Sequence, residues 1–136
     1  AEIKQFHVRD GASIKLLASK GIELAIITGR NSSMVSRRAE ELDIKYVVQG
    51  AESKTQALKT LIEDGFPEEN LCAIGDDLQD LQLFGHPSIT LKATVADAHP
   101  VVLQAADFIT QRRGGRGVAL ELAELILKAK GQWDFN

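Results

Sequence analysis

The stretch LCAIGDDLQD, residues 71–80, combines a short apolar run with three carboxylates. Residues 71–74 have the length and composition of a buried strand in a parallel sheet. Asp76, Asp77 and Asp80 follow at the end of that strand, where ligands bind in open parallel sheets. Carboxylates this close repel one another by several kcal/mol, and a hard, oxygen-preferring cation such as Mg²⁺ relieves the repulsion. The stretch therefore predicts an α/β fold with a cation site.

Short apolar runs alternate with segments of helical period along the whole chain, which is the pattern of repeated strand–helix units. We expect helices over 12–20, 32–42, 54–64 and 117–130. We expect strands over 24–28, 46–49, 71–74, 88–91 and 107–109. The prediction is a Rossmann-like parallel sheet with helices on both faces, in a single domain spanning residues 1–136 without a cap domain. Residues 2–8 are expected to form an extended arm or half of a hairpin.

The composition excludes several classes of protein. A net charge of -3 and an isoelectric point near 5.6 argue against a nucleic-acid binder, which normally carries a basic face. No apolar run approaches the ~20 residues that a membrane-spanning helix needs, so no membrane role is expected. Cys72 lies in an apolar run and is expected to be a buried hydrophobe rather than a reactive thiol. With no signal peptide visible, a cytoplasmic location is expected.

A second apolar run, residues 24–27, ends in Thr28-Gly29-Arg30. Thr28 offers a hydroxyl and Gly29 an unobstructed backbone N–H. The helix that begins near Ser32 can face its N-terminal amides toward an anion. The alternative is a plain turn between strand and helix with a Ser cap, but the nearby carboxylate motif favours phosphate binding.

Lys54 opens the third expected helix, where the positive end of the helix dipole disfavours a cation. A phosphate oxygen together with a carboxylate would compensate, and an exposed Lys on a solvated face is the alternative. We predict that Asp76 is the metal ligand. Asp77 and Asp80 could instead cap the helix that starts near Leu78, and for Asp80 the capping role is favoured.

Three glycines surround Arg116 in the segment 114–117, which precedes the last expected helix. The guanidinium of Arg116 could grip a carboxylate or a phosphate with two hydrogen bonds, and a plain flexible loop is the alternative. The histidines have no spacing typical of a metal cluster, so structural roles are expected for His7, His86 and His99.

Taken in this order, the residues resemble the motifs of the haloacid dehalogenase phosphatase superfamily. Thr28 matches its second motif, Lys54 its third and residues 75–77 its fourth. A closer resemblance, to the capless branch that acts on 3-deoxy sugar-acid phosphates, rests on residues 8–11, 27–30, 75–77, 96–100 and 114–117. These five motifs occur in family order over nearly the whole chain, which makes the resemblance specific.

The resemblance implies Mg²⁺-dependent hydrolysis of 3-deoxy-D-manno-octulosonate 8-phosphate, a small-molecule sugar phosphate used for lipopolysaccharide precursors. It implies an aspartyl-phosphate intermediate and assembly as a homotetramer. The implied catalytic residues are Thr28, Lys54 and Asp77, the implied metal ligand is Asp76, and the implied substrate contacts are Gly29, Arg30, Arg9 and Arg116.

One family motif is absent from residues 1–136: the Asp-x-Asp-Gly sequence that supplies the nucleophile and the general acid from the first strand. A truncated or incompletely recorded chain is expected, lacking the central strand and the first hairpin strand, and the 136 residues alone should show no phosphatase turnover. Three alternatives stay open. They are a phosphatase for nine-carbon sialic-type sugar acids, a non-catalytic oligomerisation domain of a cytidylyltransferase, and a doubly wound receiver or small-molecule binding module.

Overall fold

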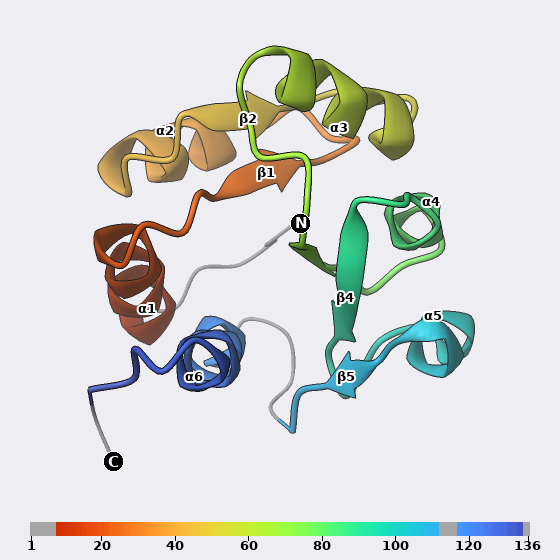
Figure 1. The fold of residues 1–136 in the computed structure, drawn as a ribbon. Coiled ribbons are helices and arrows are strands. Elements are labelled where there is room, and N and C mark those ends of the chain that lie inside the picture. The colour runs from red at the N-terminus through yellow and green to blue at the C-terminus, as the bar shows by residue number, and fades with distance from the viewer. Residues whose placement is uncertain (1–7, 112–116, 135–136) are drawn as a thin grey trace.

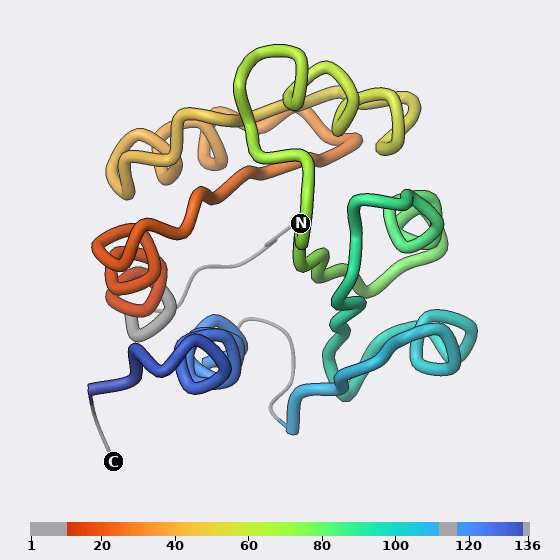
Figure 2. The backbone as a smooth tube through the Cα atoms, viewed as in Figure 1, coloured from red at the N-terminus to blue at the C-terminus, as the bar shows by residue number. Residues whose placement is uncertain are grey.

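The computed structural model describes residues 8–111 and 117–134, with side chains from residue 11 onward (Figures 1 and 2). The helices of this part of the chain are α1 (Val8–Ser19), α2 (Ser33–Glu41), α3 (Lys54–Glu63), α4 (Asp80–Phe84), α5 (Pro100–Ala105) and α6 (Val118–Ala129). The strands are β1 (Ala25–Ile27), β2 (Tyr46–Val48), β3 (Leu71–Ile74), β4 (Ile89–Thr94) and β5 (Phe108–Ile109). None of the described helices has the length and apolar character needed to span a membrane.

All strand pairs in the described residues are parallel, which confirms the predicted α/β class. β1 pairs with β2 in register Ala25 to Tyr46, and β3 pairs with β4, which pairs in turn with β5. Figure 1 shows α2 and α3 beside β1 and β2, while α4 and α5 accompany β4 and β5. Helices α1 and α6 pack against each other in a third group.

The sheet is divided into two parts, with a cavity between them. Within the described residues, β1 has a neighbouring strand on one edge only, and so has β3. All residues of both strands line a cavity of about 740 Å³, together with α6 residues such as Val118 and Leu122. The lining from these elements is mostly apolar, as expected for the interior of a domain.

The largest group of buried apolar side chains joins the elements around this division. It includes Ile27 of β1, Leu58 of α3, Ala73 of β3 and Leu122 of α6. Helices α3 and α6 both bury apolar side chains: Leu58 and Leu61 of α3 are buried, and so are Leu122 and Leu127 of α6.

Several element boundaries differ from the expected ones. β4 continues to Thr94, beyond the expected end at residue 91, because Ala93 and Thr94 are buried and pair with the neighbouring strands β3 and β5. Val8 begins α1 and is therefore not part of an extended arm, and the rest of that arm, residues 1–7, lies outside the described residues.

Helix α5 was not predicted, although its signals are present in the sequence. Pro100 occupies the first helical turn, and the Nδ1 of His99 accepts a hydrogen bond from the N–H of Val101 at 3.1 Å. This cap confirms the structural role expected for His99. His86 is also structural, since its Nδ1 accepts a hydrogen bond from the N–H of Ser88 at 3.1 Å.

Burial of Cys72 raises the pKa of its thiol to about 11, which fits the expected inert, hydrophobic role. We predict that the thiol is almost entirely protonated at pH 8 and is alkylated by iodoacetamide roughly two orders of magnitude more slowly than a free cysteine. The reaction rate should rise as the pH increases toward 11. Alkylation of the folded protein at the rate of free cysteine would contradict this.

Leu83 of α4 is 1% exposed, whereas Leu78 in the preceding loop is 52% exposed. We predict that Leu83→Ala lowers the free energy of unfolding by about 2–5 kcal/mol, because it removes buried apolar surface and leaves a cavity. Leu78→Ala is the matched control and should change it by less than about 0.5 kcal/mol. Urea denaturation measures both, and equal effects would contradict the packing described.

Candidate active site

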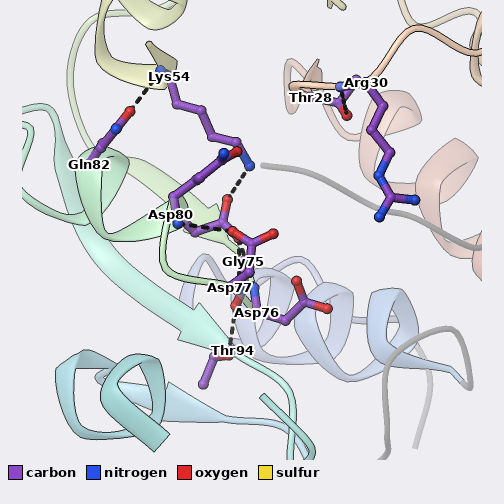
Figure 3. Close-up of polar contacts among 10 residues, drawn as sticks. Thr28, Arg30, Lys54, Gly75, Asp76, Asp77, Asp80, Gln82 and Thr94 are labelled. Carbon is purple, nitrogen blue, oxygen red and sulfur yellow. Dashed lines mark hydrogen bonds and ion pairs between the residues drawn. The ribbon is translucent and has the colours of Figure 1, made fainter. Parts of the chain in front are cut away.

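The carboxylate of Asp80 organises the loop that follows β3 (Figure 3). Its Oδ2 accepts hydrogen bonds from the backbone N–H groups of Asp76, at 2.9 Å, and Asp77, at 3.1 Å. Its Oδ1 accepts a hydrogen bond from the Nζ of Lys54 at 2.5 Å. Asp80 thus bridges the loop to α3, and the prediction that it caps its own helix is wrong. Burial explains the difference, since a carboxylate that is 1% exposed needs a counter-charge as well as backbone donors.

Gly75 makes this arrangement possible because it has no side chain. A Cβ at position 75 would overlap the carboxyl group of Asp80. The backbone carbonyl of Gly75 accepts a hydrogen bond from the Oγ1 of Thr94 at 2.6 Å, and the side chain of Thr94 is fully buried. The turn is therefore held against β4 on one side and against Asp80 on the other.

Lys54 is buried, with a side chain 1% exposed, so the alternative of a solvated lysine is wrong. The carboxylate predicted to compensate its charge is that of Asp80. The N-terminus of α3 has two further partners: the Oγ of Ser53 accepts from the N–H of Gln56 at 3.2 Å, and the Oε1 of Gln82 accepts from the N–H of Lys54 at 3.0 Å. These caps satisfy donors that a helix start otherwise leaves without partners.

The turn after β1 is tied to the turn after β2. The N–H of Gly50 donates to the carbonyl of Arg30, and the N–H of Ala51 donates to the carbonyl of Thr28, each at 3.0 Å. The buried hydroxyl of Thr28 accepts from the N–H of Arg30 at 3.1 Å. A Cβ at Gly29 would lie 3.4 Å from the carbonyl oxygen of Ala51, so the two turns approach each other closely.

Ser32 caps α2, as in the alternative of a plain turn with a Ser cap: its side chain accepts a hydrogen bond from the N–H of Val35. Gln49, which the sequence analysis did not single out, adds a second tie. Its Oε1 accepts from the N–H of Ser32 at 2.7 Å, and its Nε2 donates to the Oγ of Ser36 at 2.6 Å. The start of α2 is therefore fixed to the end of β2.

The predicted site residues come from both sheets. Lys54, Asp76 and Asp77 lie together around Asp80, and Figure 3 shows Thr28 and Arg30 on a separate element from this group. The two groups approach each other through Gln79, whose Oε1 is 3.3 Å from the position of a Cβ at Gly29. The substrate contact predicted for Arg116 lies outside the described residues, and Arg9 lies in the first turn of α1, where side chains are not described.

The carboxylates fit a hard cation such as Mg²⁺. One oxygen from each of Asp76, Asp77 and Asp80 lies within 4.8 Å of the others. Both oxygens of Asp80 already accept hydrogen bonds from Lys54 and the loop, and Asp77 Oδ1 accepts from the N–H of Gln79 at 3.0 Å. Asp76 is half-buried and is the first carboxylate after β3, and it stays the predicted ligand, since Mg²⁺ is usually bound by one or two carboxylates.

Like Gln49, Gln82 and Thr94 are structural residues of the site that sequence reasoning missed. Gln82 stands two residues after Asp80, but nothing in its spacing shows that α4 lies beside the start of α3. Thr94 ends β4 and could have been found from the pairing of β3 with β4, which places Ile74 opposite Ala93.

Replacing Asp76 and replacing Asp80 should have different effects on stability and on Mg²⁺ binding. We predict that Asp80→Asn lowers the free energy of unfolding by about 3–5 kcal/mol, because it leaves the buried ammonium of Lys54 without its counter-charge. Asp76→Asn should leave stability within about 1 kcal/mol and weaken Mg²⁺ binding at least tenfold. Thermal unfolding and Mg²⁺ titration separate the two. Equal, mild effects in both measurements would contradict the assignment.

Comparison with known proteins agrees with this geometry. The family described as haloacid dehalogenase-like hydrolase matches residues 47–122. The chain is 40% identical over 134 residues to 3-deoxy-D-manno-octulosonate 8-phosphate phosphatase of Escherichia coli K12, covering 98% of this chain and 70% of that protein.

Solved structures give the same result. A putative phosphatase of the same name from Vibrio cholerae superposes with a TM-score of 0.89 at 38% identity, covering 98% of this chain and 74% of that one. The enzyme from Moraxella catarrhalis, in complex with magnesium, phosphate and KDO, superposes with a TM-score of 0.87 at 40% identity, covering 98% and 76%. This chain belongs to the haloacid dehalogenase-like hydrolase family.

Proposed function

We propose that this protein is a Mg²⁺-dependent phosphatase that hydrolyses 3-deoxy-D-manno-octulosonate 8-phosphate to the free sugar acid and phosphate. The observation that carries the proposal is the carboxylate of Asp80, which joins the ammonium of Lys54 to the loop that presents Asp76 and Asp77. A cation site and a buried ammonium thus lie side by side, which is what neutralising a transferring phosphoryl group requires. The Escherichia coli relative carries the name of this activity, and the Moraxella catarrhalis structure contains magnesium, phosphate and KDO.

The described residues divide the work as follows. Asp76 would hold Mg²⁺, which neutralises charge on phosphoryl oxygens when bound. Lys54 donates from its ammonium to a phosphoryl oxygen; its near-complete burial strengthens this interaction, because water is excluded. The hydroxyl of Thr28 and the backbone N–H of Gly29, at the end of β1, donate hydrogen bonds to the remaining phosphoryl oxygens. Asp77 follows the metal ligand in the sequence and adds a second negative charge beside the cation.

The nucleophile belongs, in this proposal, to a strand that occupies the cavity between β1 and β3. Two observations support this: the lining of the cavity is mostly apolar, and in the described residues β1 pairs only with β2 and β3 only with β4. Each of β1 and β3 therefore has one edge without a paired strand. A parallel strand there would end between Thr28, after β1, and Asp76, after β3. An aspartate at its end would meet the phosphoryl group held by those residues.

The complete protein, supplied with Mg²⁺, should release phosphate from 3-deoxy-D-manno-octulosonate 8-phosphate. Lys54→Met and Thr28→Val should each lower kcat by about 10²–10³-fold, since each removes a donor to the transferring group. Arg30→Ala should mainly raise KM, because Arg30 is proposed to contact the carboxylate of the sugar acid. Phosphate release assays measure all three. Clear preference for a nine-carbon sialic-type phosphate, or unchanged kinetics in Lys54→Met, would contradict the proposal.

The proposal includes a homotetramer in the cytoplasm that binds neither nucleic acid nor membranes. It is supported by the family resemblance, the acidic net charge and the free thiol of Cys72, since a reducing compartment preserves free thiols. Light scattering on the complete protein should report four times the mass of one chain. A monodisperse monomer would contradict the assembly.

A further inference from the structure

Lys54 is held at both of its ends by the short helix α4 (Figure 3). Its ammonium donates to the Oδ1 of Asp80 at 2.5 Å, and its backbone N–H donates to the Oε1 of Gln82 at 3.0 Å. A third contact joins the same two helices, because the Oγ1 of Thr55 donates to the backbone carbonyl of Gln82 at 3.1 Å. The first turn of α3 is thus attached to α4 at three points, two of which involve Gln82.

This attachment bears on the geometry of Lys54 for two physical reasons. Fixing a lysine side chain in one conformation costs up to about 2 kcal/mol of conformational entropy. If the backbone of Lys54 is already held in place, less of this cost remains when its ammonium binds a phosphoryl group. The first N–H groups of a helix also lack partners within the helix, so the side-chain oxygen of Gln82 supplies one that the chain itself cannot.

Ser53 does not duplicate this function. Its side chain accepts from the N–H of Gln56, two residues further into α3, and leaves the N–H of Lys54 to Gln82. The side-chain oxygen of Gln82 is also the negative end of the amide dipole. It lies at the start of α3, where Lys54 carries a positive charge. It therefore offsets part of the unfavourable interaction between Lys54 and the dipole of α3.

We propose that Gln82 is a positioning residue that orients Lys54 for phosphoryl transfer, acting through the backbone N–H of Lys54. The inference rests on the proposed function for the role of Lys54, but the hydrogen bond itself is a feature of the structure. The role requires the acceptor oxygen of the Gln82 side chain rather than its bulk.

Kinetics with 3-deoxy-D-manno-octulosonate 8-phosphate test the proposal in the complete protein. Gln82→Met, which keeps the volume and loses the acceptor, should lower kcat about tenfold with KM within twofold. Gln82→Glu keeps an oxygen acceptor and should restore kcat to within about threefold of the wild type. Gln104→Ala, an exposed glutamine on α5, is the matched control and should leave both constants unchanged.

A double-mutant cycle separates positioning from a general structural effect. In a Lys54→Met background, Gln82→Met should cause no further loss of kcat, because the group that it orients is gone. A tenfold loss in that background too, or a lowered Tm with unchanged kcat, would overturn the inference.

A binding measurement keeps this test independent of the substrate assignment. The affinity of Gln82→Met for orthovanadate with Mg²⁺ should be about tenfold lower than that of the wild type. The affinity of the double variant should equal that of Lys54→Met. Absence of turnover by the wild type with this vanadate pattern intact would overturn the proposed substrate but support the role of Gln82. Equal vanadate affinity of Gln82→Met and the wild type would overturn that role.

Discussion

The buried ion pair between Lys54 and Asp80 is the interaction on which the site depends. Two charged side chains, each 1% exposed, are costly to remove from water unless they are paired and fully hydrogen-bonded. Here the remaining oxygen of Asp80 accepts two backbone N–H groups, so the carboxylate is satisfied on both sides. The same contacts fix the loop after β3, and the geometry of Asp76 and Asp77 follows from them.

Two constraints make that pair possible. Position 75 must be glycine, because a Cβ would occupy the space of the Asp80 carboxyl group. Helix α4 must lie beside the start of α3, and Gln82 contributes to this by bonding to the N–H of Lys54 and to the hydroxyl of Thr55. Buried networks of this kind tolerate no missing partner, which explains why so many short contacts converge on one loop.

The division of the sheet gives the site its place. The turns after β1 and β3 both stand at the carboxyl ends of parallel strands, on either side of the cavity that those strands line. Each turn is held from its own half: the first by Gly50 and Ala51 from the turn after β2, and the second by Thr94 at the end of β4. A ligand that contacts both turns would therefore lie over the cavity that separates the two halves of the sheet.

The sequence by itself determined the class of the fold and the place of the candidate site residues at one edge of the sheet. Short apolar runs alternate with amphipathic segments because parallel strands are buried on both faces while helices are buried on one. The residues that follow such runs must then stand at the edge of the sheet where ligands bind. The sequence places Thr28 and Asp76 at that edge, and it shows that Lys54 needs an anionic partner.

Only the tertiary structure decided which anion that partner is. Asp80 could cap a helix or pair with a lysine 26 residues away in sequence, and both roles suit its local sequence equally well. The packing of α4 against α3 selects the pair, because burial removes water as an alternative partner for either charge. Gln82 shows the same limit: a polar side chain on a short helix has no periodicity that reveals its partner, and only the proximity of another helix start gives it one.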